Sequence, residues 1–207
     1  QAKNGSIIRN ITIVGNLSAI ESVVLRPEVS GKIVKIFFKD GENVKKGDPL
    51  YKIDDAIYAA KLKEAEARLA LNKEEHKRVI KIYFDNTVIK APFDGVMGLS
   101  NVSVGAFVSE SVELVDIVNL DPINVDFSVP ESYLSCVHLG DEVDVTVEDF
   151  DLLPVPAVIK AIDPKIDETT RTVIIRAQMP NKELAYRPGE FSRVTVLTGK
   201  IENAVLI

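Results

Sequence analysis

The chain has 207 residues, 46% of them hydrophobic and 27% charged, which fits two or three small folded domains and excludes a disordered chain. Its formal net charge of −6 argues against a nucleic-acid partner. A single cysteine, Cys136, excludes an internal disulfide and a cysteine-based metal cluster. No apolar run reaches the roughly 18 residues that a membrane-spanning helix needs.

Short strands are predicted over the first 53 residues. Residues 11–14 are β-branched, and 29–53 form a strand–turn–strand–turn–strand unit. Glycines at Gly41 and Gly47 mark the turns of that unit. This pattern indicates a β-rich domain of short strands, as in barrels and sandwiches.

Residues 54–83 differ from the rest because they contain no Gly or Pro and are rich in Ala, Leu, Glu and Lys, which favour helix. Asp54 and Asp55 suit the N-cap and the first turn. An apolar stripe at helical spacing breaks after Leu69, and a new one starts further on. We therefore expect two short helices, or a stunted helical hairpin, with a turn at Leu71, Asn72 and Lys73.

A second unit, 93–117, repeats the first unit, 29–53, without a gap when the chain is shifted by 64 residues. The glycines permit matching turns, and the valine and leucine that follow them point inward. Neither copy can bury its apolar face alone, so we expect one pseudo-symmetric flattened barrel. The repeat residues are Gly31 with Gly95, Gly41 with Gly105, Val44 with Val108 and Leu50 with Leu114.

Further β-branched segments that predict strands, such as 143–147 and 172–175, lie in the C-terminal half, and short strands of this kind suggest a barrel or a sandwich. Cys136 follows Tyr133-Leu134-Ser135, and at this position a small packing residue is favoured over a reactive thiol. Arg187-Pro188-Gly189 is typical of a hairpin turn. The run Thr169, Thr170 and Arg171 leaves two interpretations open, namely turn chemistry and a partner-docking role.

No catalytic, cofactor-binding or metal-binding constellation is predicted. His76 and His138 are far apart in sequence, which suits surface or packing roles. Met97 and Met179 are unclustered, whereas soft metal ions such as Cu(I) need several sulfur ligands. The acidic pairs suit a helix start and a turn rather than an acid–base dyad.

The segments 30–34 and 40–50 resemble half of a biotinyl/lipoyl domain. In carrier domains of that type the two halves join at a hairpin bearing a modifiable lysine, and here the helical segment occupies that junction. A lipoyl-like domain split by helices resembles the membrane fusion protein (periplasmic adaptor) family of RND-type tripartite efflux pumps. Three further stretches agree with this resemblance, which runs from about residue 20 to 198: 89–95, 161–164 with 169–172, and 187–191.

The resemblance implies a mainly β fold: a split lipoyl-like flattened barrel with a short helical insertion, an antiparallel β-barrel domain and part of a membrane-proximal β domain. The implied boundaries are 1–15 and 201–207 for the membrane-proximal remnants, 16–26 and 117–200 for the β-barrel, 27–53 and 87–116 for the lipoyl-like domain, and 54–86 for the helical hairpin.

The insertion is atypical, because family members carry a long α-hairpin whose tip meets the outer-membrane channel. Ile53 and Thr87 lead into adjacent strands and must lie close together. A straight helix over 55–83 would be roughly 43 Å long, and the residues left over could return only about 10 Å. The helix must therefore turn back. Either the hairpin is naturally short, which the continuous numbering favours, or a loop is missing from the sequence.

The resemblance further implies a non-enzymatic periplasmic adaptor without cofactors, linking an inner-membrane RND transporter to an outer-membrane TolC-like channel for multidrug efflux. It implies a homo-oligomer, trimer or hexamer, anchored to the inner membrane through an N-terminal lipid or helix that precedes the residues present. Two alternatives stay open. One is an adaptor for an ABC-type exporter or type I secretion system, and the other is a biotin or lipoate carrier subunit, which the missing carrier lysine disfavours.

Overall fold

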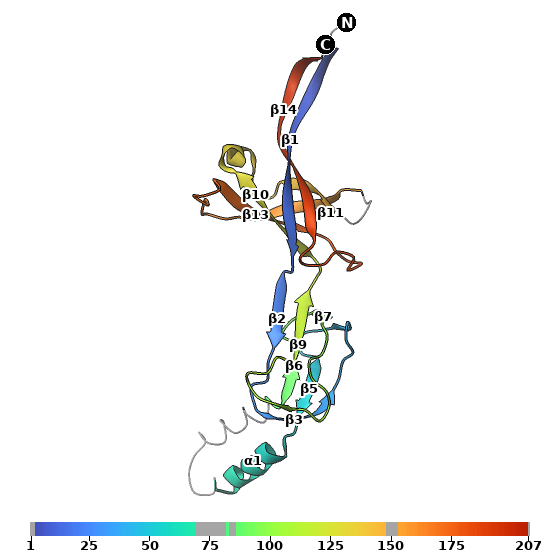
Figure 1. The fold of residues 1–207 in the computed structure, drawn as a ribbon, viewed down its shortest axis with the longest axis vertical. Helices are drawn as coiled ribbons and strands as arrows, with labels where there is room; N and C mark the ends of the chain where they lie inside the picture. The colour runs from blue at the N-terminus through green and yellow to red at the C-terminus, as the bar shows by residue number, and fades with distance from the viewer. Residues whose placement is uncertain (1–2, 69–81, 83–85, 148–152, 207) are drawn as a thin grey trace. The chain divides into compact units, whose positions relative to one another are not determined.

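The computed structural model describes residues 3–68, 82, 86–147 and 153–206, and it divides into two compact units (Figure 1). We call residues 21–119 the sandwich unit and residues 1–20 with 120–207 the barrel unit.

The sandwich unit consists of two four-stranded antiparallel sheets, ordered β2-β9-β7-β4 and β6-β5-β3-β8. A shared hydrophobic core lies between them, with Ile33, Leu50, Leu114 and Ile117 fully buried. The strands are β2 (Glu21–Leu25), β3 (Gly31–Ile36), β4 (Asn43–Val44), β5 (Pro49–Ile53), β6 (Val88–Lys90), β7 (Gly95–Met97), β8 (Phe107–Val108) and β9 (Val115–Asn119).

The two sheets are related by the same 64-residue shift that the sequence shows. Replacing β2, β9, β7 and β4 by their equivalents β6, β5, β3 and β8 converts one strand order into the other. The hydrogen bonds repeat as well: the Gly41 N–H donates to the Met97 carbonyl at 3.1 Å, and the Gly105 N–H donates to the Ile33 carbonyl at 2.8 Å. Both glycines have positive φ, 77° and 98°, which a residue with a Cβ rarely adopts. The two copies therefore close on each other as one pseudo-two-fold module.

The barrel unit is a closed antiparallel barrel of order β1-β10-β13-β12-β11-β14. Its core follows from strand alternation: along β10, Ile123, Val125, Phe127 and Val129 are buried, while Ser128 is exposed. A 3₁₀ helix, η1 (Glu131–Cys136), connects β10 to β11. The strands are β1 (Lys3–Ser18), β10 (Ile123–Pro130), β11 (Glu142–Val147), β12 (Val155–Ile162), β13 (Thr172–Met179) and β14 (Phe191–Leu206).

The mainly β fold class is confirmed, but the unit boundaries differ from the implied ones. The resemblance implies that 21–26 and 117–119 belong to the barrel, whereas β2 pairs with β9 inside the sandwich unit. Ile11 and Ile13 pack against the barrel core, so the barrel begins before residue 16. Strands β1 and β14 continue side by side from the barrel to the pair Lys3 and Leu206 (Figure 1). A membrane-proximal role for 1–15 and 201–207 stays a prediction.

Candidate partner-docking surfaces

The helical insertion leaves the sandwich unit at the seam between the two copies. The Ile53 N–H donates to the Thr87 carbonyl at 2.8 Å, and Lys52 lies opposite Val88 in the β5–β6 ladder. The expected closeness of Ile53 and Thr87 is confirmed. Because the two ends of the insertion are hydrogen-bonded neighbours, the strands of the sandwich pair without it.

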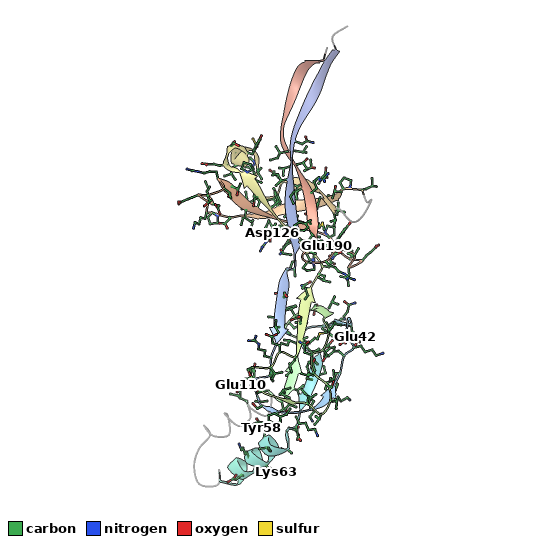
Figure 2. The ribbon with its side chains drawn as sticks, viewed as in Figure 1. Glu42, Tyr58, Lys63, Glu110, Asp126 and Glu190 are labelled. Atoms are coloured by element: carbon green, nitrogen blue, oxygen red, sulfur yellow. The ribbon has the colours of Figure 1, made fainter. Side chains whose placement is uncertain are left out.

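The start of the insertion is the helix α1 (Ala56–Arg68). The Asp55 carbonyl accepts from the Ala59 N–H at 2.7 Å, and the Asp54 carboxylate accepts from the Ala56 N–H at 3.0 Å. Both aspartates therefore cap the start of α1 as predicted, but they precede the helix and neither lies in its first turn. The Tyr58 hydroxyl donates to the Ser30 carbonyl at 3.1 Å. That bond joins the first turn of α1 to the first copy of the repeat (Figure 2 labels Tyr58).

The predicted turn and candidate docking residues Leu71, Asn72 and Lys73 lie outside the described residues, as does His76. The turn stays a prediction.

The second predicted docking segment, Thr169–Arg171, lies in the exposed loop between β12 and β13. The Asp167 carboxylate accepts hydrogen bonds from the Thr169 and Thr170 N–H groups at 2.8 and 2.9 Å. These bonds stabilise the charged form and lower the pKa of Asp167 below its ordinary value. Arg171 adopts φ 53°. Turn chemistry thus accounts for the segment's shape, and its exposed side chains remain available for contact.

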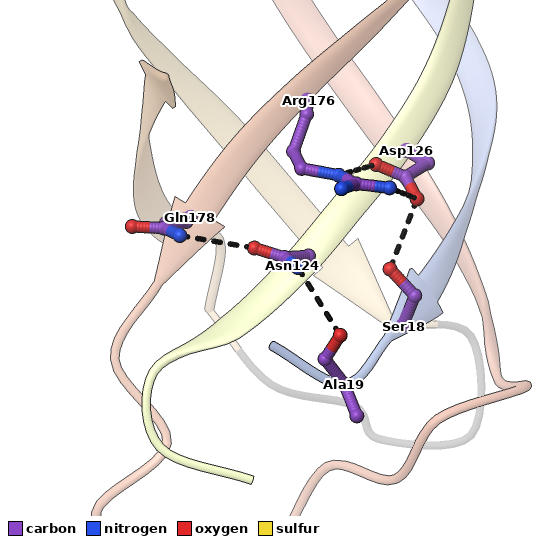
Figure 3. A network of polar contacts seen from close by, with 6 residues as sticks. All are labelled: Ser18, Ala19, Asn124, Asp126, Arg176 and Gln178. Carbon is purple, nitrogen blue, oxygen red and sulfur yellow. Dashed lines mark hydrogen bonds and ion pairs between the residues drawn. The ribbon is translucent and has the colours of Figure 1, made fainter. Parts of the chain in front are cut away.

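A polar network on the outer surface of the barrel, which the sequence did not reveal, joins β1, β10 and β13 (Figure 3). The Arg176 guanidinium donates to both Asp126 carboxylate oxygens at 2.6 and 2.8 Å, and the Ser18 hydroxyl donates to Asp126 at 2.9 Å. The hydrogen bond to Asp126 raises the pKa of Arg176. Since Ser18 and Asp126 are 108 positions apart in the chain, only the β1–β10 register brings them together.

The remaining predicted sites lie where packing or turns explain them. Met97 is buried in the sandwich core and Met179 in the barrel core. His138 is exposed near Asp141, with 3.6 Å between its Nδ1 and a carboxylate oxygen. Cys136 is half-buried at the end of η1, so it is less buried than expected.

Within the part of the chain that the structure describes, no cluster of three or more His, Cys, Asp or Glu side chains could hold a metal ion. In that same part, none of the helices has the length and apolarity to cross a bilayer. Arg187-Pro188-Gly189 forms the expected turn into β14, with Gly189 at φ 95° and its N–H donating to the Leu17 carbonyl at 2.9 Å.

Known proteins match both units. The model of the RND MFP barrel-sandwich hybrid domain matches residues 21–119, and that of the CusB-like β-barrel domain matches 122–200. The solvent efflux pump periplasmic linker SrpA of Pseudomonas putida is 29% identical over 238 residues, covering 93% of this chain and 62% of SrpA. The multidrug resistance protein MexA of Pseudomonas aeruginosa is 28% identical over 246 residues, covering 97% of this chain and 64% of MexA.

A solved structure shows the same fold. It is a MacA–MexA chimera containing the MexA α-hairpin domain of Pseudomonas aeruginosa, with a TM-score of 0.80, 24% identity, and coverage of 100% of this chain and 87% of the chimera. The chain spans less than two thirds of the length of SrpA and MexA. With both characteristic domains matched in order and in fold, this chain belongs to the RND-type membrane fusion protein family.

Proposed function

We propose that the chain is part of a periplasmic adaptor that links an inner-membrane RND transporter to an outer-membrane TolC-like channel for multidrug efflux and performs no catalysis. One observation carries the proposal: the two copies of the repeat close on each other while a helix leaves from their seam. A module whose two copies close on each other, with a helix that leaves from between them, suits a coupler that holds two proteins at a fixed distance. The similarity to SrpA, a solvent efflux pump periplasmic linker, and to the multidrug resistance protein MexA supports this role.

The adaptor acts as a homo-oligomer, trimer or hexamer, in the periplasm, held at the inner membrane through an N-terminal lipid or helix. Leu71, Asn72 and Lys73 contact the channel, and Thr169, Thr170 and Arg171 contact the transporter. The alignment with SrpA extends over 238 residues although this chain has 207, so SrpA contains residues within the aligned region that this chain lacks. We assign that difference to a shorter helical hairpin.

Site-specific photo-cross-linking in the host cell tests the two contacts. A photoreactive amino acid at position 72 should capture an outer-membrane channel, and one at position 170 an inner-membrane transporter. Lys63, exposed on α1, provides the control position. Capture of the same protein from positions 72 and 170, or of no membrane protein from either, contradicts the adaptor role.

Dye efflux from cells lacking the gene tests the transport partner. The full-length protein should restore efflux, and a proton uncoupler should abolish it, because RND transporters use the proton gradient. Efflux that persists under the uncoupler but stops on ATP depletion would favour an ABC-type partner. Intact mass after co-expression with biotin and lipoate ligases should show no added mass, which separates the adaptor from a carrier subunit.

A further inference from the structure

Two adjoining hollows lie on the outer surface of the barrel unit, where β12 connects to β13. The larger has a volume of about 410 Å³ and the smaller about 260 Å³. They adjoin because Asp163 and Ile174 line both of them. The larger volume falls in the range of roughly 300–1,000 Å³ that is typical of small-molecule pockets. We call the two hollows together the barrel hollow and ask which ligand its lining suits.

Part of the lining is apolar. Ile174 is 52% exposed although its neighbours on β13, Val173 and Ile175, are buried, so its side chain points outward from the barrel. Ile162 and Pro164 line the smaller hollow together with it. Exposed aliphatic surface of this kind favours a ligand that buries an apolar group against it.

The larger hollow is negatively charged. The carboxylates of Asp163, Asp167 and Glu168 line it, and the lysine Lys165 lines it with them. These four side chains carry a net charge of −2, from three negative charges and one positive charge. Among residues 3–68, 82, 86–147 and 153–206, no lysine or arginine forms an ion pair with the three carboxylates. Their charge is therefore available to a ligand.

Backbone hydrogen bonds hold two of the carboxylates in place. The Lys165 N–H donates to Asp163 Oδ1 at 2.8 Å. The Thr169 and Thr170 N–H groups donate to Asp167 Oδ1 at 2.8 and 2.9 Å. Because the carboxylates are ordered before a ligand arrives, binding costs less conformational entropy.

The arginine of the smaller hollow does not cancel this negative charge. Arg176 lines that hollow, but its guanidinium donates to both carboxylate oxygens of Asp126 at 2.6 and 2.8 Å (Figure 3). Since Asp126 neutralises Arg176, the three carboxylates of the larger hollow keep their excess of negative charge.

We propose that the barrel hollow binds an amphipathic cation, a small molecule with one positive charge on an apolar or aromatic frame. The charge lies among Asp163, Asp167 and Glu168. The frame packs on Ile174 and Ile162. An anion would meet like charge, and a hydrophilic cation would leave the aliphatic surface exposed to water. This inference goes beyond the proposed function, which assigns no ligand to the chain.

Fluorescence titration of the full chain with ethidium tests the ligand class, because ethidium is an aromatic monocation whose emission rises when it leaves water. Wild type should bind ethidium, and it should bind fluorescein, an aromatic anion, about tenfold or more weakly. Raising NaCl from about 0.05 to 0.5 M should weaken ethidium binding as the charges are screened. N-acetylargininamide, a hydrophilic cation, should not displace ethidium at equal concentration. Displacement would identify a basic side chain of a partner protein as the occupant and overturn the proposal.

Substitutions that keep side-chain size test the assigned residues. Asp163→Asn with Glu168→Gln removes two negative charges and should weaken ethidium binding about three- to tenfold. Lys165→Gln removes the positive charge and should strengthen binding about twofold. Ile174→Thr keeps a β-branched side chain in the strand but removes apolar surface, and should weaken binding about threefold.

A matched variant elsewhere on the barrel unit controls for net charge. Glu142→Gln/Asp144→Asn removes two negative charges from exposed positions of β11 and should leave ethidium binding unchanged. Unchanged thermal unfolding should establish that all variants fold. No binding by wild type, wild-type binding by the Asp163/Glu168 or Ile174 variant, or equal weakening in the control would each overturn the inference. Efflux and cross-linking measure the adaptor role separately, so either proposal can fail alone.

Discussion

Glycine is required at two equivalent positions, 31 and 95, by what lies directly above them rather than by turn geometry. A Cβ on Gly31 would stand 2.5 Å from the Ile53 Cγ2 methyl. A Cβ on Gly95 would stand 2.8 Å from the Val118 carbonyl oxygen and 3.1 Å from Ile117 Cγ1. The obstacle is thus a side-chain methyl in one copy and backbone in the other.

Gly31→Ala and Gly95→Ala should each destabilise the sandwich unit by about 1–3 kcal/mol, through overpacking. Ile53→Leu removes the Cγ2 methyl and should recover part of the loss caused by Gly31→Ala. Ile117→Leu should not rescue Gly95→Ala, because the Val118 backbone stays in place. Urea unfolding of the two alanine variants, the two leucine variants and the two double variants gives one coupling energy for each glycine–isoleucine pair. Equal rescue in both copies would contradict this account.

At the scale of elements, the sequence predicts the repeat well because its glycines and buried apolar residues recur at fixed spacing. The helix start at Asp54 and Asp55 is also local, since neighbouring residues supply its hydrogen bonds. The boundary between the units, in contrast, cannot be predicted from neighbouring residues. Segment 21–25 is β-branched and fits either unit, and only its pairing with β9 assigns it to the sandwich.

The polar surface contacts were missed for a related reason. The Ser18–Asp126–Arg176 network needs the registers of three strands, which composition does not encode. The sequence predicts that Thr169–Arg171 form a turn. It does not show whether these residues also bind a partner, because turns and docking sites both use exposed polar residues.

The attachment of α1 to the sandwich unit gives a prediction at this scale. Tyr58→Phe removes the hydroxyl that donates to the Ser30 carbonyl at 3.1 Å. A single neutral hydrogen bond contributes about 0.5–1.5 kcal/mol. We expect α1 to open more often, with hydrogen exchange of its backbone amides accelerated about two- to tenfold and exchange in β3 and β5 unchanged. Tyr133→Phe, in η1 of the barrel unit, is the matched control. Unchanged exchange in α1 would show that this bond does not hold the helix.

At the scale of the whole molecule, folding and coupling can be separated because the sandwich unit closes without its insertion. The pseudo-symmetric core contains residues from both copies, and the Ile53–Thr87 hydrogen bond already joins the ends of the gap. Strands β5 and β6, which flank the insertion, are paired antiparallel as in a hairpin. The insertion is therefore an addition to a sandwich whose strands already pair, and within its described residues Tyr58 packs against the core.

Replacing residues 54–86 by Asn-Gly should give a two-residue hairpin turn between Ile53 and Thr87. Shortening the loop lowers its closure entropy cost by about 2 kcal/mol, which offsets the lost contacts of Tyr58 and Asp55. The variant should unfold within a few degrees of the wild-type temperature by calorimetry and should fail to restore dye efflux. A parallel variant that keeps the insertion but carries Tyr58→Phe should retain efflux. If the hairpin variant restores efflux, the insertion is not the part that reaches the channel, whereas if it fails to fold, the two copies do not form an independent core.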